Sequence, residues 1–240
     1  PNINNKIKCA AFCEMDGYVS ANQTGDAYTK ALKENNVEII ENFEVSKINN
    51  SNNNYEIIDV HGKKINAKKI VLAAGVYLEK ILKLLDISIK IKCFPQQLIV
   101  TERMPELLKT VITVAHGKLS LKQFENGTVL IGGGWPGKGN IENGYNETIP
   151  ENLIGNMRLA CHAIPNLKNS RVSRVWLGLE AETDDAMPII GELPNLKNAF
   201  IIGSIHSGYT SGPYMGKLLS EKILGKDVDL SLFDIRRLMN

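Results

Sequence analysis

Residues 200–213 read Phe-Ile-Ile-Gly-Ser-Ile-His-Ser-Gly-Tyr-Thr-Ser-Gly-Pro, and this stretch decides the fold. An apolar strand runs into a loop of Gly, Ser and Thr. The loop leads into a helix that we expect from about Ser211 to Leu224, closed by Gly225. The first turn of a helix presents unpaired backbone N–H groups and a partial positive charge to whatever lies in front of it. The stretch therefore predicts half of a cofactor site.

The other half of such a site, a Gly-rich dinucleotide fingerprint after an early strand, does not occur in the sequence. Glycine runs such as 132–134 are present, but none reads strand, G-x-G-x-x-G, helix. The chain begins with Pro1 rather than Met, and a polar run follows. We expect it to be the carboxyl-terminal portion of a longer protein, with a processed chain as the alternative.

Composition excludes several classes of protein. Charged residues make up 22% and hydrophobic residues 43% of the chain, as in ordinary globular proteins. The net charge of +2 without a basic stripe argues against a nucleic-acid partner. No apolar stretch approaches the roughly 20 residues of a membrane span, and we expect no signal peptide within these residues, although a truncated chain could have lost one.

The four cysteines predict a reducing compartment and a cytoplasmic location. Cys9 and Cys13 could meet on one helical turn, but Cys93 and Cys161 form no second close pair to complete a tetrahedral site. We therefore expect buried or free thiols and no metal.

The first third of the chain alternates helix and strand. Thr24 is expected as the N-cap of a helix over residues 25–35, because Ala and apolar residues recur there at helical spacing. An apolar run over residues 69–75 is typical of a parallel strand buried on both faces. The other elements expected here are strands at 37–41, 43–48 and 55–60, a turn at 49–54 and a helix at 77–85.

The pattern changes near residue 88. Short alternating segments separated by turn residues predict an antiparallel meander, with strands at 89–94, 97–101, 111–115, 119–124 and 128–132. Pro150 opens a helix to about Ala163, and residues 171–179 form a further strand with Trp176 in the core. The fold class is therefore α/β, with an antiparallel domain inserted into a Rossmann-like framework. The expected domains are 1–87, 88–180 and 181–240.

Three segments resemble the D-amino-acid oxidase family of FAD-dependent amine oxidoreductases, which includes glycine oxidase, sarcosine oxidase and opine dehydrogenase subunits. The first is Asp16-Gly-Tyr-Val-Ser with the helix and strands up to Ile48, and the second is Val71-Leu-Ala-Ala-Gly75. The third, over about 45 positions, includes Arg174-Val-Trp-Leu-Gly178, Asp184-Asp-Ala-Met-Pro188, Ile190-Gly191 and Phe200 to Pro213. The resemblance covers nearly the whole chain and implies an FAD-binding domain with an inserted antiparallel substrate domain.

The resemblance also implies which residues contact FAD. Val45 matches a residue whose backbone meets the adenine, and the strand end at Ala73, Ala74 and Gly75 matches a turn beside the pyrophosphate. At the end of the later strand and the start of the last helix, the residues that would face the flavin are Gly203, Gly208, Tyr209, Thr210 and Ser211. His206 and Tyr209 are the candidate catalytic residues, with a structural histidine as the alternative for His206.

Substrate recognition is where the chain departs from the family. In glycine-oxidase-like members an arginine two residues after the glycine matched by Gly178 binds the substrate carboxylate, whereas here that position is Glu180. Glu180 would repel a carboxylate and favour an ammonium group. Alternatively, a carboxylate is held by Arg103, Arg174 or the hydroxyls of Tyr209 and Tyr214, with a surface role as the alternative for Arg174. Opine-like, N-alkylated and cyclic imino substrates therefore remain open.

Two functions of different class follow. The first is FAD-dependent oxidation of an amine or of an amino or imino acid, by hydride transfer from the carbon bearing nitrogen to flavin N5. The second is a non-catalytic subunit or interaction module that no longer binds FAD. Without the fingerprint, the 240-residue chain is expected to bind FAD poorly and to be inactive alone. A preceding segment or a partner subunit would complete it.

Overall fold

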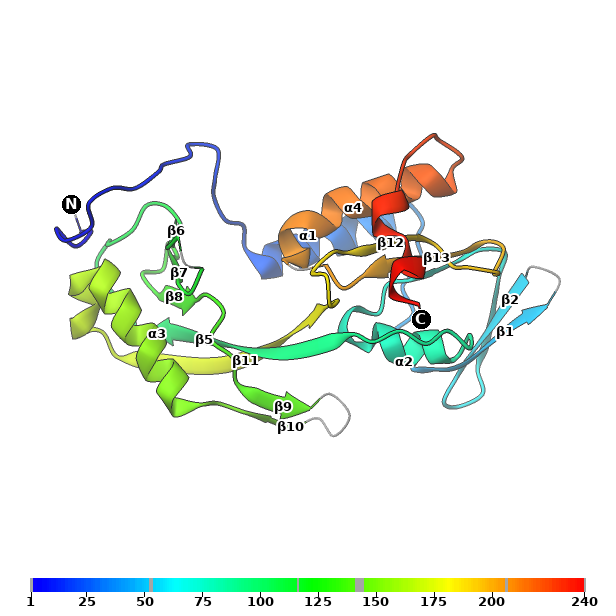
Figure 1. Ribbon diagram of the computed structural model, residues 1–240, viewed down its shortest axis with the longest axis horizontal. Coiled ribbons are helices and arrows are strands. Elements are labelled where there is room, and N and C mark those ends of the chain that lie inside the picture. Colours follow the sequence, from blue (N-terminus) through cyan, green and yellow to red (C-terminus); the bar gives the residue numbers. More distant parts are fainter. Residues whose placement is uncertain (1, 52–53, 116, 141–144, 206, 240) are drawn as a thin grey trace. The chain divides into compact units, whose positions relative to one another are not determined.

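The computed structural model describes residues 2–51, 54–115, 117–140, 145–205 and 207–239, which form two compact units (Figure 1). One unit combines Pro1–Ile39 with Pro95–Gly178, and the other combines Ile40–Phe94 with Leu179–Asn240. Each contains helices and sheets, which confirms the α/β class. Which parts of the chain form the cofactor domain and the substrate domain stays a prediction.

The first unit is built on a five-stranded sheet in the order β11-β5-β8-β7-β6. Strands β5, β8, β7 and β6 pair antiparallel in turn, and Ile131 lies opposite both Ile99 and Leu121. These pairings confirm the predicted meander, although the two strands expected at 89–94 and 97–101 form one strand. The bounds are β5 Lys92–Thr101, β6 Ile112–Thr113, β7 Ser120–Gln123, β8 Val129–Gly132 and β11 Val172–Glu182.

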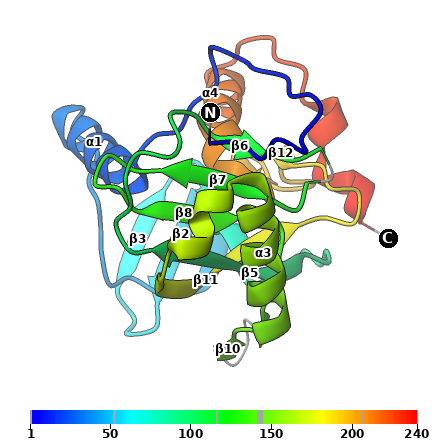
Figure 2. The ribbon, with the colours of Figure 1, turned by 90° about the vertical axis from the view of Figure 1, so that its left-hand side faces the viewer.

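Helix α3 (Pro150–Ala163) begins and ends as predicted and lies across the strands of this sheet (Figure 2). Proline suits its first turn because the missing N–H would have no helical partner there. The Asn156 side chain, 1% exposed, donates to the carbonyl of Gly132 at 3.0 Å and ties the helix to β8. Between helix and sheet lies a core of Ile99, Leu119, Leu121, Val129, Ile131, Ala160, Ala163, Ile164 and Leu167.

Hydrogen bonds fasten the amino-terminal segment to the rest of the first unit. The Asn4 N–H donates to the carbonyl of Ala163 at 2.9 Å, and the Tyr18 hydroxyl donates to that of Gln123 at 2.6 Å. Helix α1 (Ala21–Glu34) follows, and Ser20 rather than Thr24 is its N-cap. The Ser20 hydroxyl accepts the N–H of Gln23, whereas Thr24 lies one turn inside the helix. A short ribbon of β9 (Lys138–Asn140) and β10 (Tyr145–Glu147) completes the unit.

The prediction of a strand over residues 37–41 was wrong. This segment has no regular structure, and Val37 and Ile39 are each close to half exposed. Asn36 and Asn42, at the two sides of the segment, have positive φ angles of 57° and 56°, which interrupt an extended backbone. In the described part of the chain no strand pairs with it.

The second unit contains two three-stranded sheets. The first is an antiparallel meander of β1 (Val45–Ser51), β2 (Asn54–Asp59) and β3 (Lys64–Ala67). The predicted strand at 55–60 is therefore confirmed, whereas residues 49–51 of the expected turn at 49–54 belong to β1 and Asn54 belongs to β2. The Tyr55 side chain is fully buried, and its hydroxyl donates to the carbonyl of Lys197 at 2.7 Å.

The other sheet has the order β12-β13-β4. Strand β4 (Ile70–Leu72) runs parallel to β13 (Ala199–Gly203), as the apolar pattern predicts, and β12 (Ile189–Glu192) runs antiparallel to β13. The prediction that β4 is buried on both faces was wrong, because Val71 is 46% exposed. Among the described residues β4 is an edge strand, so no second neighbour shields it.

Two helices pack on this sheet. Helix α2 (Leu78–Lys83) contacts β4, and its buried Leu78 and Leu82 join the core shared with Ile189 and Ile201. Helix α4 (Gly208–Ile223) contacts β12 and β13, where Leu219 packs with Ile190, Phe200 and Leu230. The last helix thus forms as predicted, starting three residues earlier. Short 3-10 turns at Gly75–Tyr77, Pro165–Asn169, Ser231–Phe233 and Ile235–Leu238 complete the described structure.

None of the described helices is both long enough and apolar enough to cross a membrane.

Candidate functional site

The loop between β13 and α4 has an unusual backbone. Ser204 and Ser207 have positive φ angles of 48° and 56°, in the left-handed region that residues with a Cβ rarely adopt. Such conformations persist where the surrounding structure over-determines them, and they cluster at functional sites. His206, the candidate catalytic histidine, lies outside the described residues. The loop geometry therefore supports a functional site without testing that role.

The first turn of α4 begins directly after Ser207. The N–H groups of Thr210 and Ser211 both donate to the carbonyl of Ser207, at 2.9 and 3.2 Å. Tyr209 and Tyr214 are 52% and 61% exposed. The positive end of the α4 dipole thus lies beside a solvent-accessible surface.

Glu180 places a carboxylate at this end of α4. It lies near the end of β11, and its Oε1 accepts the N–H of Ser207 at 3.3 Å. A negative charge is stabilised at a helix amino terminus, which explains why the side chain lies here. The contact brings together two of the predicted site regions, the substrate candidate Glu180 and the loop before α4.

Ser204 is a site residue that the sequence analysis did not single out. It is 2% exposed, and its hydroxyl has no hydrogen-bond partner within the described part of the chain. A buried hydroxyl without a partner costs free energy, and a bound ligand with a complementary polar atom removes that cost. A serine directly after an apolar strand, in the loop before a glycine-started helix, was the available signal.

The end of β4 is the second predicted cofactor region. Ala73 and Ala74 follow the strand, and Gly75 has a φ of 55° with open space where a Cβ would lie. A left-handed turn beside open space lets a ligand approach the backbone closely. This geometry is compatible with the cofactor role of the three residues, which stays a prediction.

Gly203 has a packing reason to be glycine. A Cβ at this position would lie 2.6 Å from Cδ2 of Leu78, which is fully buried. The close approach of β13 and α2 therefore explains why this position has no side chain. Val45, the predicted adenine neighbour, is the first residue of β1 and packs half-buried against the same core. Cofactor contacts of Gly203 and Val45 stay predictions.

The two candidate arginines lie in the first unit. Arg174 is exposed, and its guanidinium lies 5.9 Å from the ring centroid of Trp176, a cation–π contact. Trp176 is 37% exposed, so its expected place in the core was wrong. Arg103 is exposed and lines a pocket of about 510 Å³. Their roles toward a substrate stay predictions.

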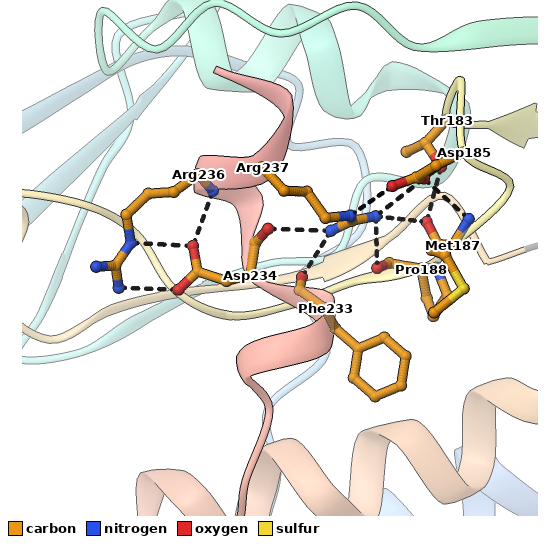
Figure 3. Close-up of polar contacts among 8 residues, drawn as sticks. All are labelled: Thr183, Asp185, Met187, Pro188, Phe233, Asp234, Arg236 and Arg237. Atoms are coloured by element: carbon orange, nitrogen blue, oxygen red, sulfur yellow. Dashed lines mark hydrogen bonds and ion pairs between the residues drawn. The ribbon is translucent and has the colours of Figure 1, made fainter. Parts of the chain in front are cut away.

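The sequence analysis missed a polar network around Arg237 (Figure 3). Its Nε and Nη2 donate to the Asp185 carboxylate at 2.7 and 3.3 Å, and its guanidinium also donates to four backbone carbonyls. These carbonyls belong to Phe233, Asp234, Met187 and Pro188. The network fastens the last turns of the chain to the loop between β11 and β12.

The Asp185 carboxylate is fully engaged in this network. Besides Arg237 it accepts the Thr183 hydroxyl at 2.7 Å and the Met187 N–H at 3.0 Å. The hydrogen-bonded Arg237 guanidinium, aided by these two donors, holds the pKa of the Asp185 carboxyl well below its usual range. The network therefore depends on an ionised Asp185.

All four cysteines are free thiols. Cys9 and Cys13 are exposed, whereas Cys93 and Cys161 are half-buried, and burial raises the pKa of both half-buried thiols. In the part of the chain that the structure describes, no three His, Cys, Asp or Glu side chains gather as a metal site.

Sequence comparison relates the chain to flavoenzymes. A family profile described as DAO, FAD dependent oxidoreductase, matches residues 1–222. Hydrogen cyanide synthase subunit HcnC of Pseudomonas protegens is 29% identical over 237 residues, with 95% of this chain and 55% of that protein covered. An opine oxidase subunit from Rhizobium meliloti is 25% identical over 242 residues, with coverages of 99% and 61%. The chain thus spans a little over half the length of these curated relatives.

Solved structures share the fold. The L-proline dehydrogenase of P. horikoshii matches with a TM-score of 0.78 and 24% identity, over 90% of this chain and 59% of that one. Glycine oxidase of Geobacillus kaustophilus matches with a TM-score of 0.69 and 19% identity, over 84% and 54%. At these identities the likeness concerns the fold alone.

Proposed function

Because the chain belongs to the DAO family of FAD-dependent oxidoreductases, we propose that the protein oxidises an amine or amino acid at the carbon bearing nitrogen, with FAD as acceptor. The observation that carries the proposal is the loop between β13 and α4. There the positive end of a helix, a buried hydroxyl without a partner among the described residues, and exposed tyrosines follow the end of a strand. Open α/β sheets bind ligands at the carboxyl ends of their strands.

The residues of this loop suit the flavin. The Ser204 hydroxyl lacks a partner among the described residues, and a polar flavin edge would satisfy it. The loop lies at the positive end of α4, whose dipole stabilises negative charge there, although the N–H groups of Thr210 and Ser211 already donate to the Ser207 carbonyl. Bound FAD would accept a hydride at N5 and carry the resulting negative charge near N1. Val45 and the turn from Ala73 to Gly75 are proposed to hold the adenine and pyrophosphate portions.

The chain's own contribution to catalysis is orientation and electrostatics. An amine in its neutral form supplies the lone pair that drives hydride loss, so no side-chain base is strictly required. The exposed residues Tyr209 and Tyr214 are proposed to orient the substrate, with His206 as a further candidate. The expected division, with residues 1–87 and 181–240 binding FAD and residues 88–180 binding the substrate, stays a proposal, and residues 1–39 lie in one unit with 95–178.

The carboxylate of Glu180 favours amines that carry no carboxylate close to the reacting nitrogen. It lies at the amino terminus of α4, where its charge repels an anionic group and attracts an ammonium. N-alkylated, opine-like or cyclic imino compounds that keep their carboxylate away from this end satisfy the requirement. Simple α-amino acids are therefore disfavoured.

FAD binding is proposed to need more protein than these 240 residues. The sequence contains no dinucleotide fingerprint, and β4 is an edge strand among the described residues. A preceding segment or a partner protein that adds a strand and a Gly-rich loop would complete the site. Several relatives are named as subunits, namely HcnC of hydrogen cyanide synthase and subunits of opine oxidase and sarcosine oxidase. We therefore favour a subunit of a multi-chain enzyme.

One observation favours the second candidate, a non-catalytic module. The Glu180 carboxylate already accepts the Ser207 N–H, so a protein anion lies where a flavin edge would otherwise receive that donor. A module of this kind would bind no FAD even when all its partner segments are present.

Replacement of Ser204 by alanine tests the flavin assignment. Because the Ser204 hydroxyl has no described partner, Ser204→Ala should leave thermal stability unchanged or slightly higher. FAD affinity, measured by flavin fluorescence quenching on the complete protein, should fall about fivefold with the loss of one hydrogen bond. Ser220→Ala, late in α4 and exposed, is the control for FAD affinity and should leave it unchanged, because its hydroxyl donates within the helix to the carbonyl of Lys217. Equal FAD affinity in Ser204→Ala and the unmodified protein would refute the assignment.

A further inference from the structure

The pocket beside Arg103 is a second candidate binding site, made entirely by the first unit. It measures about 510 Å³, within the usual range for small-molecule sites. Its polar lining includes Arg103, Arg171, Glu102, Glu106, Asn166 and Asn169. No residue of the loop before α4 lines it, so the proposed flavin chemistry does not account for it.

Backbone pairing brings the two arginines together. The Glu102 N–H donates to the carbonyl of Arg171 at 2.9 Å, which joins the end of β5 to the start of β11. Arg103 directly follows Glu102, so its backbone lies next to that of Arg171. Two guanidinium groups on neighbouring strand ends thus line one pocket.

The charges of this pocket are not balanced within the chain. Neither guanidinium has an ion-pair or hydrogen-bond partner among the residues that the structure describes, and the same holds for the Glu102 carboxylate. Glu106 differs, because its carboxylate lies 3.4 Å from Nζ of Lys109. Two uncompensated positive groups and one uncompensated negative group leave one net positive charge facing the pocket.

We infer that this pocket binds a small organic anion through a single carboxylate. Guanidinium groups match carboxylates with paired N–H donors, and the side-chain amides of Asn166 and Asn169 can donate to or accept from the rest of the ligand. A ligand of charge −1 neutralises the pocket, whereas a doubly charged phosphate meets repulsion from Glu102. The inference goes beyond the proposed oxidation, since it needs neither FAD nor the α4 loop.

The experiment is a titration of the 15N-labelled 240-residue chain with N-acetylglycine at constant ionic strength. This probe carries one carboxylate and one amide. Saturable shifts of the arginine side-chain N–H signals are expected, and both Arg103→Gln and Arg171→Gln should weaken binding about fivefold. Glu102→Gln should strengthen binding, because it removes the repelling charge.

Arg158→Gln is the matched control. Arg158 is an exposed arginine of α3 that does not line the pocket, so its loss should leave the affinity unchanged. The inference is overturned by absence of saturable shifts, by equal weakening in Arg158→Gln, or by weaker binding in Glu102→Gln. Tighter binding of inorganic phosphate than of N-acetylglycine would overturn the assignment to a carboxylate. All four positions are exposed, so we expect every variant to fold. Thermal unfolding of each variant checks this.

Discussion

Replacing Arg237 by methionine removes every polar contact that its guanidinium makes and keeps most of the side-chain volume. All three guanidinium nitrogens are engaged: Nε with Asp185, Nη1 with two carbonyls and Nη2 with two carbonyls and Asp185. The substitution leaves four carbonyls and one carboxylate without this donor. We expect the segment from Ser231 to Leu238 to detach more readily from the loop between β11 and β12.

The free energy lost in Arg237→Met is estimated from how exposed the contacts of its guanidinium are. The side chains of Arg237 and Asp185 are 21% and 40% exposed, so their ion pair is partly screened and contributes about 1 kcal/mol. The four carbonyl hydrogen bonds add about 0.5 kcal/mol each, the low end for partly exposed groups. The total of about 3 kcal/mol corresponds to a roughly hundredfold larger population of the detached segment.

Amide hydrogen exchange measured by mass spectrometry reports this population directly. Peptides covering residues 231–238 should exchange about a hundredfold faster in Arg237→Met, while those from β2 should not change. Arg236→Met is the control, because Arg236 is 67% exposed and its side chain pairs only with Asp234 among the described residues. Arg236→Met should change the free energy of detaching this segment by less than about 0.5 kcal/mol. Equal exchange rates in the two variants would refute the reasoning.

Gly203→Ala should lower the free energy of unfolding by about 1–3 kcal/mol in urea titrations, because its Cβ would meet the buried Leu78 at 2.6 Å. Gly216→Ala, a position inside α4 with nothing within 4 Å, should raise it by about 0.5–1 kcal/mol; destabilisation by both would contradict the packing argument. Asp185, whose folded-state pKa is lowered, stabilises the fold above its unfolded-state pKa, and this contribution is lost as the pH falls below about 4. Asp185→Asn should therefore have a lower melting temperature near neutral pH, and its melting temperature should fall less steeply as the pH is lowered below about 4. An unchanged pH dependence of the melting temperature would count against the network. Glu180→Gln should raise kcat/KM for substrates with an α-carboxylate about fivefold relative to amines without one, and an unchanged ratio would exclude Glu180 from selectivity.

Local sequence signals predicted the elements that local physics determines. The helix from Pro150 to Ala163 has proline in its first turn and a helical apolar pattern, and it forms with the expected bounds. The strand at β4 and its parallel partner β13 follow from continuous apolar runs ending in small residues. The segment from Val37 to Glu41 failed because an alternating apolar pattern makes a strand only when a partner strand is available.

Long-range contacts set the limits of the sequence analysis at the site. The approach of Glu180 to Ser207 joins residues 27 positions apart, and Arg237 reaches Asp185 across 52 positions. Neither pairing has a periodic signature, and the turns near Arg237 are too short to show one. The positive φ angles of Ser204 and Ser207 could not be predicted from the sequence either, because serine, unlike glycine, does not indicate a left-handed backbone.

The central claim is that this protein is a flavin-dependent amine oxidoreductase whose loop before α4 faces the flavin. The most direct measurement is the visible absorbance of the protein as the cell makes it, loaded with FAD and mixed anaerobically with candidate amines. Bleaching of the oxidised-flavin bands by N-alkylated or cyclic imino compounds, more rapid than by simple α-amino acids, is the predicted result. A protein that binds FAD and is reduced by no amine, or that takes up no FAD, would contradict it.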